Sequence, residues 1–355
     1  MNAASEQIIC TLFDHRYLPR GLCMINSIRA HGGHQRVWVL CLSAECERAL
    51  EDLALPNVHP LALRELERHI PSLNTAKVQR KPIEYYFTCM AALHRYIFDT
   101  VPEANGTMYV DADIQFFANP NLVFDAIGEA PVAVIPHNFP PALHERFRRF
   151  GLYNAGWSAF RRTPEGMACL DWWLARSIEW CHDYVDGDRY ANQGYLMHFK
   201  EMAPQTKILA QKGFNCAPWN IGGYDVREEN GEILVDGERL VFFHFHGLKL
   251  HYGVFYFDSH RDYGAPLTRL VRDRIYKPYV REMLVQERRV QNMLHTSNSA
   301  VHAPLPRGKD SSNVSTAMAL IAWLRRQKSA AVDLLHRALD LAAGRPILVW
   351  RGRVW

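Results

Sequence analysis

The chain has 355 residues, of which 48% are hydrophobic and 22% are charged, and this balance excludes a disordered or fibrous protein. The formal net charge is +4, but nine Lys or Arg and three Asp lie between positions 307 and 355, so the rest of the chain carries a net charge of −2. Because the basic residues gather near the C-terminal end, nothing in the main part of the chain indicates a nucleic-acid partner.

The cysteines and the hydrophobic segments indicate where the protein works. The eight Cys are scattered and form neither a C-x-x-C pair nor the Cys/His spacing of a zinc site. No hydrophobic segment approaches the length of a membrane span, and the N-terminus has no basic region followed by an apolar core. We therefore expect reduced cysteines and a cytoplasmic location.

The first 136 residues alternate apolar segments with helix-like segments. Strands are predicted at 8–13, 37–42, 107–110 and 132–135. Helices are predicted at 18–28, after Ser43 as an N-cap, and at 84–98. Because the strands are apolar along their whole length and helices separate them, we expect an α/β fold with a mainly parallel sheet covered on both faces.

The second half of the chain is more mixed. The elements predicted there are a strand at 153–160, a helix at 164–182, a hairpin of 233–235 and 240–243 around Asp236-Gly237, and a helical segment at 267–294 that Pro278 breaks. We assign residues 1–295 to one domain.

Two further segments follow this domain. Residues 296–315 are rich in Ser, Asn, Pro and Gly, which predicts a linker. Residues 316–355 are predicted to be a basic amphipathic helical tail, because apolar residues recur at helical spacing between Ile321 and Leu339. Such a tail suits the surface of an anionic membrane, which would place the protein peripherally on its inner face. The alternative is a helix that packs on the domain or on a partner subunit.

The clearest chemical motif is the pair Asp111 and Asp113, which follows an apolar strand. Side chains two residues apart on a strand point the same way, so we expect both carboxylates to face one site. The end of such a strand is where open α/β sheets bind ligands, and two carboxylates suit a divalent cation that also binds substrate phosphates. A second D-x-D, Asp186-Gly187-Asp188, has no strand before it, and we interpret it as a surface turn.

Five short segments resemble, in the expected order, motifs of the glycogenin-like and lipopolysaccharide-type glycosyltransferases (family 8 and its relatives). The opening strand and loop, the metal motif, the N-A/S-G segment, the Asp-Gln position and the H-x-x-G-x-x-K motif correspond to 11–21, 109–114, 153–156, 192–193 and 243–249. The resemblance runs from residue 7 to 249.

This resemblance implies a GT-A type fold with a helical C-terminal appendage and a hexosyltransferase-type activity. The enzyme would move a sugar from a nucleotide-diphosphate donor, with a UDP-sugar favoured, to a glycan or lipid-linked acceptor such as a lipopolysaccharide core. The implied cofactor is Mn²⁺ or Mg²⁺, held by Asp111, Asp113 and His244. Catalysis at the sugar is implied for Asn154, Asn192 and Gln193. Contacts to the nucleotide and its phosphates are implied for Thr11, Phe13, Asp14, Tyr17, Arg80, Asp111, Ala112, Asp113, Gly247 and Lys249.

Two positions depart from the family pattern. Asn192 stands where many members have Asp, and Lys249 comes one residue early, so the stereochemistry of transfer and a phosphate role for Lys249 stay open. His246 follows His244 at the spacing of strand neighbours and could face the same site. Trp219 could stack on an acceptor ring, or it could belong to the core.

Two other functional classes stay as alternatives. A sugar nucleotidyltransferase needs a Gly-rich, basic loop directly after the first strand to hold a triphosphate, and residues 14–19 contain no glycine cluster. The second alternative is a non-catalytic nucleotide- or carbohydrate-binding protein on the same fold. It stays open because Asn192 lacks the carboxylate that many family members have at this position.

Overall fold

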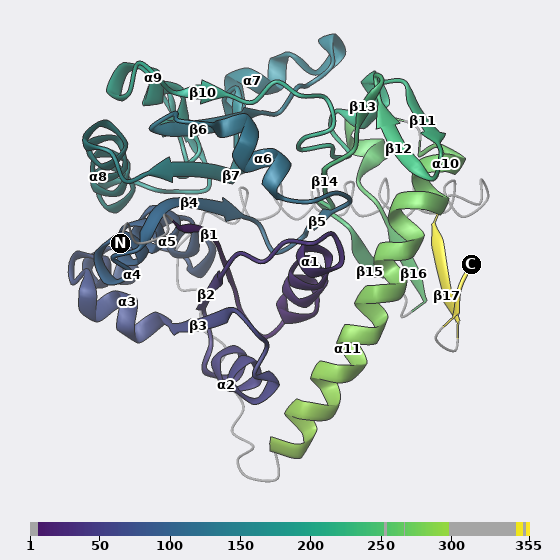
Figure 1. The fold of residues 1–355 in the computed structure, drawn as a ribbon, viewed down its shortest axis with the longest axis horizontal. Coiled ribbons are helices and arrows are strands. Elements are labelled where there is room, and N and C mark those ends of the chain that lie inside the picture. Colours follow the sequence, from purple (N-terminus) through teal and green to yellow (C-terminus); the bar gives the residue numbers. More distant parts are fainter. Residues whose placement is uncertain (1–5, 252–253, 266, 298–345, 351–352) are drawn as a thin grey trace, which may run out of the picture.

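A seven-stranded sheet forms the centre of the molecule (Figure 1), a computed structural model that describes residues 6–251, 254–265, 267–297, 346–350 and 353–355. The strands in spatial order are β10 (Lys207–Ile208), β6 (Val132–Pro136), β7 (Tyr153–Arg161), β4 (Ala104–Val110), β1 (Glu6–Phe13), β2 (Val37–Cys41) and β3 (Val58–Ala62). β7 pairs antiparallel with β4 and β6, and the other pairings are parallel, which confirms the predicted mainly parallel sheet. β3 was not predicted because Pro60 interrupts it, which an edge strand tolerates.

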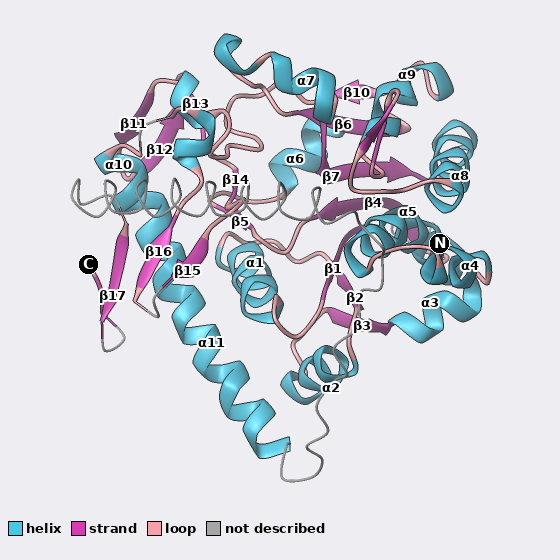
Figure 2. Cartoon of the chain, turned by 180° about the vertical axis from the view of Figure 1, so that it is seen from behind, coloured by secondary structure: helices cyan, strands magenta, loops and turns pink. Residues whose placement is uncertain are grey.

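Helices cover both faces of this sheet (Figures 1 and 2). α1 (Leu18–Ala30), α2 (Ala44–Leu53) and α6 (Asn121–Ile127) share one hydrophobic core with it, and α3 (Leu63–His69), α4 (Ser72–Val78), α5 (Pro82–Thr100) and α8 (Pro164–Glu179) share the other. Neighbouring strand residues divide between the cores: Ile9 and Val39 belong to the first, Ile8 and Leu40 to the second. All four are fully buried, which explains why the strands are apolar along their whole length.

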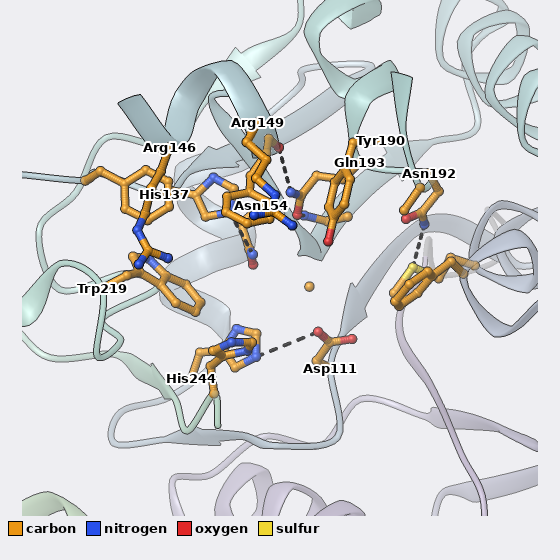
Figure 3. Close-up of a pocket in the computed structure, with 18 of the residues that line it drawn as sticks. Asp111, His137, Arg146, Arg149, Asn154, Tyr190, Asn192, Gln193, Trp219 and His244 are labelled. Carbon is orange, nitrogen blue, oxygen red and sulfur yellow. Dashed lines mark hydrogen bonds and ion pairs between the residues drawn. The ribbon is translucent and has the colours of Figure 1, made fainter. Parts of the chain in front are cut away.

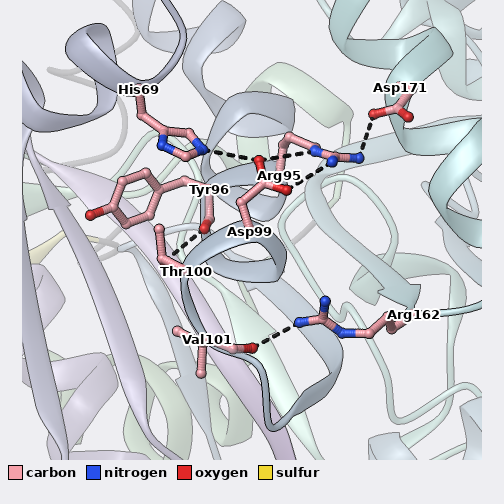
Figure 4. A network of polar contacts seen from close by, with 8 residues as sticks. All are labelled: His69, Arg95, Tyr96, Asp99, Thr100, Val101, Arg162 and Asp171. Atoms are coloured by element: carbon pink, nitrogen blue, oxygen red, sulfur yellow. Dashed lines mark hydrogen bonds and ion pairs between the residues drawn. The ribbon is translucent and has the colours of Figure 1, made fainter.

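Polar contacts orient α5 between its neighbours (Figure 4). His69 Nε2 on α3 lies 3.0 Å from Asp99 Oδ2 on α5, and Arg95 pairs with Asp99 at 2.7 Å and with Asp171 of α8 at 2.9 Å. Arg162, after β7, donates to a backbone carbonyl at the end of α5 at 2.8 Å. Partly exposed ion pairs contribute about 0–1 kcal/mol each to the free energy of unfolding. We therefore interpret these contacts as fixing the orientation of α5 more than as stabilising the fold.

Smaller sheets lie beside the central one. β11 (Val226–Glu229), β12 (Glu232–Val235) and β13 (Glu238–Arg239) form one, and β5 (Ile114–Phe116) pairs with β14 (Phe242–His244). A third contains β15 (Lys249–His251), β16 (Phe255–Phe257), β17 (Ile347–Trp350) and β18 (Arg353–Val354), and a fourth pairs residues 185–186 with residues 189–190.

The predicted hairpin is right in its turn and wrong in its second strand. Val235 pairs with Glu238 around Asp236-Gly237, whose φ angles of 49° and 82° suit a tight two-residue turn. The following apolar residues leave the hairpin, and Phe242 and Phe243 pair with β5 instead. Both phenylalanines are fully buried, and a hairpin on the surface would leave one of them exposed.

The predicted helical segment 267–294 is continuous from residue 269 but irregular. α10 (Arg269–Val271) continues through a π-helical turn (Arg272–Tyr276) into α11 (Lys277–Ser297), so the irregularity lies directly before Pro278, whose missing N–H it accommodates. α11 packs against α1, and Asn26 donates to Glu282 at 2.9 Å across the two helices.

The C-terminal end of the chain pairs with the domain. β17 runs antiparallel to β16, and β18 to β17. Residues 347–350 are therefore a strand and not part of a helical tail; Ile347 and Val349 alternate into a buried face, as β-branched residues in a strand do. The predicted linker beyond residue 297 and the predicted helix around 321–339 lie outside the described residues. In the part of the chain that the structure describes, no helix combines the length and the apolarity that crossing a membrane requires.

Candidate active site

The pairing of β5 with β14 brings His244 to the two aspartates. β5 begins directly after Asp113, and in its antiparallel register Ile114 lies opposite His244. The backbone N–H of Phe245 donates to the carbonyl oxygen of Asp113 at 2.8 Å, which extends the pairing by one residue. His244 Nε2 consequently lies 3.1 Å from Asp113 Oδ1 and 3.8 Å from Asp111 Oδ2.

Asp111 and Asp113 meet through a turn, which corrects the expectation that they lie along one strand. β4 ends one residue before Asp111, and the N–H of Ile114 donates to the carbonyl oxygen of Asp111 at 3.1 Å, closing the turn. The N–H of Asp111 donates to the carbonyl oxygen of Gly156 on β7 at 2.9 Å, which fixes where the turn begins. The turn directs both carboxylates toward His244, so the two acids do share one site.

Asp111, Asp113 and His244 could hold one metal ion, because their ligand atoms all lie within 4.8 Å of one another. Burial acts to raise the pKa of Asp113, but the charge and hydrogen bond of His244 outweigh it and hold that pKa at about 2. At His244, burial acts to lower the pKa, and the two aspartates outweigh it and raise the pKa above 6.5. Two carboxylates and an imidazole suit Mn²⁺, and the carboxylates also suit Mg²⁺.

Gly156 leaves the space in which these side chains meet. A Cβ atom at this position would lie 2.5 Å from Asp111 Oδ2, 2.8 Å from His244 Cε1 and 2.8 Å from Asn154 Oδ1. These separations are far below van der Waals contact, so the close approach of β7 to the site requires glycine. The Asn-Ala-Gly segment therefore supplies room as well as polar groups.

A cavity of about 350 Å³, the β1-side cavity, opens on one side of this cluster. It is lined by the segment after β1, by the N-terminal half of α5 and by the aspartates; its residues include Phe13, Asp14, Tyr17, Ile83, Tyr86, Phe87, Met90, Asp111, Ala112, Asp113 and His244. Six residues that the resemblance assigned to the nucleotide and its phosphates thus gather here: Phe13, Asp14, Tyr17, Asp111, Ala112 and Asp113.

A second cavity of about 470 Å³, the α7-side cavity, shares Asp111 and His244 with the first (Figure 3). Asn154, Asn192 and Gln193 line it, so the three residues that the resemblance assigned to the sugar lie in one place. Further lining residues come from α7 (Glu145–Phe150), from β9 (Arg189–Tyr190), from the loops that carry His137 and Trp219, and from Tyr263 at the end of the 3₁₀-helix His260–Tyr263.

The side-chain amides of Asn154, Asn192 and Gln193 differ in which of their hydrogen-bonding groups already have a partner in the protein. Gln193 accepts from the N–H of Ala155 at 3.0 Å and donates to the carbonyl oxygen of Phe150 at 2.7 Å, so both ends of its amide fasten α7 to β7. Asn192 donates to the sulfur of Met90 at 2.7 Å. The Nδ2 of Asn154 lies 3.3 Å from a ring nitrogen of His137, while its buried Oδ1 has no partner among the described residues. Asn154 therefore offers an unused acceptor beside the candidate metal ligands.

Four predicted contact residues line neither cavity. Thr11 is buried within β1, and Gly247 packs against Ser259 at a φ of 74°. Lys249 begins β15 and is exposed. Arg80 donates to Thr88 Oγ1 at 2.5 Å and to the carbonyl oxygens of residues 177, at 2.7 Å, and 178, so its guanidinium joins α5 to α8.

Two further candidates, His246 and Trp219, line the cavities, and the second D-x-D does not. His246 is exposed and lines both cavities. Trp219 is only 3% exposed, yet it also lines the α7-side cavity, with its ring 5.1 Å edge-on from that of His244, so the core and pocket interpretations both apply. The second D-x-D lies at a surface hairpin turn, as predicted, but a short strand does precede it: Asp186 ends β8 (Val185–Asp186), and Gly187 and Asp188 form the turn to β9.

The sequence did not single out Arg146 and Arg149 on α7, or Tyr190 and Tyr263, as pocket residues. The segment Glu145–Phe150 reads E-R-F-R-R-F, whose charges resemble those of any solvated helix. Only the packing of α7, whose Phe147 contacts the cluster around Phe139 and Trp219, shows which of its faces meets the cavity. No sequence signal could have identified these residues.

No family model matches the chain. Over 248 residues it is 26% identical to the uncharacterized protein YfnF of Bacillus subtilis (strain 168), an alignment that covers 68% of this chain and 81% of YfnF. Over 242 residues it is 26% identical to the uncharacterized protein YfnD of the same organism, covering 68% of this chain and 77% of YfnD.

The fold is similar to that of a solved galactosyltransferase. The structure of the enzyme LgtC in complex with donor and acceptor sugar analogs superposes with a TM-score of 0.50 and 14% identity, over 78% of this chain and 94% of LgtC. Together with the mainly parallel seven-stranded sheet, this similarity confirms the fold predicted from the sequence. The chain has a GT-A glycosyltransferase fold like that of the family 8 enzymes.

Proposed function

We propose that the protein is a metal-dependent glycosyltransferase of the hexosyltransferase type. The observation that supports this most is that the two cavities meet at Asp111 and His244, which line both. A donor cleaved at this junction would keep its nucleoside diphosphate in the β1-side cavity and present its sugar to the α7-side cavity. When bound, a divalent cation would neutralise the charge that develops on the departing diphosphate.

The β1-side cavity suits a nucleoside. Tyr17, Tyr86 and Phe87 give it aromatic walls against which a base can stack. Asp14 Oδ1 accepts from the backbone N–H groups of Arg16 at 3.0 Å and Tyr17 at 3.1 Å, which fixes the carboxylate at the edge of the cavity, in reach of a ribose hydroxyl. We propose a UDP-sugar donor on the resemblance of the strand, loop and metal segments to family 8.

The α7-side cavity suits a sugar and its acceptor. The unpartnered Oδ1 of Asn154 can accept from a sugar hydroxyl, and a buried acceptor of this kind costs about 1–3 kcal/mol if it stays unpaired. Trp219 and Tyr263 add aromatic surface on which a sugar ring can pack. The acceptor that we propose is a glycan or a lipid-linked sugar.

A lipid-linked acceptor would be reached by peripheral contact of the basic tail with the cytoplasmic face of a membrane. Each basic residue near an anionic surface contributes about 1 kcal/mol to binding. Sedimentation with anionic liposomes tests this contact: the full chain carrying Arg325→Gln and Arg326→Gln should sediment less than the wild type. Equal sedimentation would contradict a membrane role for the tail.

A non-catalytic binding protein on the same fold is the alternative that Asn192 leaves open. Release of the nucleoside diphosphate separates the two: sugar conjugates of UDP, GDP, dTDP and ADP are incubated with Mn²⁺ and a panel of glycan acceptors. A transferase should release one diphosphate, and EDTA or Asp113→Asn should abolish the release. Binding of a nucleotide sugar without release in any combination would instead support a binding protein.

A further inference from the structure

We infer that the α7-side cavity recognises an anionic group, a carboxylate or a phosphate, through Arg146 and Arg149. This inference rests on the proposed function, because it names the class of sugar or acceptor that the same site would take. The single carboxylate among the described lining residues of the cavity is Asp111, whereas α7 contributes two guanidinium groups.

These charges lie on opposite sides of the cavity. Figure 3 shows Arg146 and Arg149 reaching inward from α7, across the cavity from Asp111. Neither arginine lines the β1-side cavity, where a diphosphate would lie beside Asp111 and Asp113. A diphosphate bound at the metal site would therefore leave both guanidinium groups for another part of the substrate.

The two arginines are not neutralised by the protein. Among the described residues, neither arginine forms an ion pair with a carboxylate. The same helix does carry a carboxylate, Glu145. Arg148, which does not line the cavity, pairs with Glu145 at 3.3 Å. The acidic side chain of α7 thus pairs with an arginine outside the cavity lining, and the charges of Arg146 and Arg149, which line the cavity, are left for a ligand.

The surroundings also hold these side chains in place. Arg146 donates to the carbonyl oxygen of Asp262 at 2.7 Å, and its guanidinium carbon lies 4.6 Å from the centre of the Tyr263 ring. The guanidinium carbon of Arg149 lies 5.1 Å from the centre of the Phe150 ring, and Gln193 ties the backbone of Phe150 to β7. An arginine stacked on an aromatic ring keeps most of its five N–H donors free, and two such groups on one wall match the oxygens of a carboxylate or phosphate.

The anionic group could belong to the donor sugar or to the acceptor, and calorimetric titration separates the sources. In the donor arm, UDP-glucuronic acid is compared with UDP-glucose in the presence of Mn²⁺. In the acceptor arm, methyl glucuronide and glucose 6-phosphate are compared with methyl glucoside, with and without UDP. We expect the acidic member of at least one pair to bind about tenfold more tightly, as a charge-assisted contact provides. The arm in which the preference occurs identifies the source.

Variants then test whether the arginines cause this preference. Arg146→Gln with Arg149→Gln should reduce it to about onefold, whereas Arg148→Gln on the same helix should keep it. Because Arg146 also contacts Asp262 and Tyr263, Arg149→Gln alone serves as the variant that leaves those contacts intact, and it should lose part of the preference. Binding of UDP with Mn²⁺ should stay unchanged in every variant.

Equal binding of acidic and neutral ligands to the wild type in both arms would overturn the inference, and so would a preference that survives the double substitution. Either result, with UDP binding intact, would leave the proposed function standing. Failure of every nucleotide to bind would count against the proposed function instead. The acceptor arm without UDP would still decide whether the arginines select an anion.

Discussion

His244 Nε2 lies 3.1 Å from Asp113 Oδ1, although the aspartate precedes β5 and the histidine ends β14. Their proximity depends on the antiparallel register of these two short strands. The same register places both residues in the lining of the β1-side cavity, and His244 also lines the α7-side cavity. The chemistry that we propose thus depends on a pairing between distant parts of the chain.

The contact between His244 and Asp113 makes the stability of the metal-free protein depend on pH, and it makes the metal affinity depend on pH as well. The raised pKa of His244 means that its ion pair stabilises the metal-free protein below pH 6.5, and that this stability is lost as the pH rises through the raised pKa. The pKa of about 2 at Asp113 means that its contribution, present above pH 3.8, is lost as the pH falls toward 2. Metal-free protein should therefore be most stable between these limits.

Mn²⁺ must displace the proton from His244, so its affinity should rise by up to about tenfold per pH unit until the histidine is neutral. Mn²⁺ titrations followed by Tm at pH 5.5, 6.5 and 7.5 measure this slope. His244→Gln, which has no proton to displace, should show a shallower dependence. An affinity that is the same at all three pH values in the wild type would contradict a metal role for His244.

Gly156→Ala should disrupt the site without unfolding the sheet. The added methyl group would lie 2.5 Å from Asp111 Oδ2, so the carboxylate would have to move away from His244. We expect metal-dependent nucleotide binding to weaken by at least about tenfold, which corresponds to about 1.4 kcal/mol. Gly106→Ala on β4 is the matched control, because its new methyl group would meet its nearest neighbour at 3.6 Å. Similar losses in both variants would show that the effect is general strain.

Arg80→Met should lower stability and leave nucleotide affinity unchanged. Arg80 donates to Thr88 and to two backbone carbonyls of α8, and hydrogen bonds from charged donors contribute about 1.5–3 kcal/mol each. Chemical denaturation and UDP titration measure the two quantities, with Lys81→Met, an exposed neighbour, as the control. Weaker UDP binding at unchanged stability would support the phosphate contact that the sequence suggested.

The sequence was most informative where local patterns decide the structure. Strands buried on both faces, such as β1 and β2, are apolar throughout, and Ser43 caps α2 by accepting from the N–H of Cys46 at 3.3 Å. These features depend on neighbouring residues alone. The aspartate pair was also identifiable, because an apolar strand precedes it.

Features that depend on distant pairing were less accessible. The partner of Phe242 was misassigned because the run after Asp236-Gly237 has the composition of a hairpin strand, whereas its burial is decided by β5. Arg80 lies in the sequence segment where the resemblance placed a diphosphate contact. Its long side chain instead reaches α8, where the guanidinium donates to a backbone carbonyl oxygen. Arg146 and Arg149 gave no signal, because a basic surface helix and a pocket-lining helix have the same composition.

The central claim is that Asp111, Asp113 and His244 hold a metal ion that binds a nucleotide. The most direct measurement is a thermal-shift panel of UDP, GDP, dTDP, ADP and CMP, each with Mn²⁺ or with EDTA, on the wild type and on Asp113→Asn. We predict that one nucleotide, UDP, raises the Tm of the wild type with Mn²⁺ and not with EDTA, and that Asp113→Asn loses this shift. If no nucleotide changed the Tm in the presence of Mn²⁺, or if the variant responded like the wild type, the metal-dependent transferase that we propose would be contradicted.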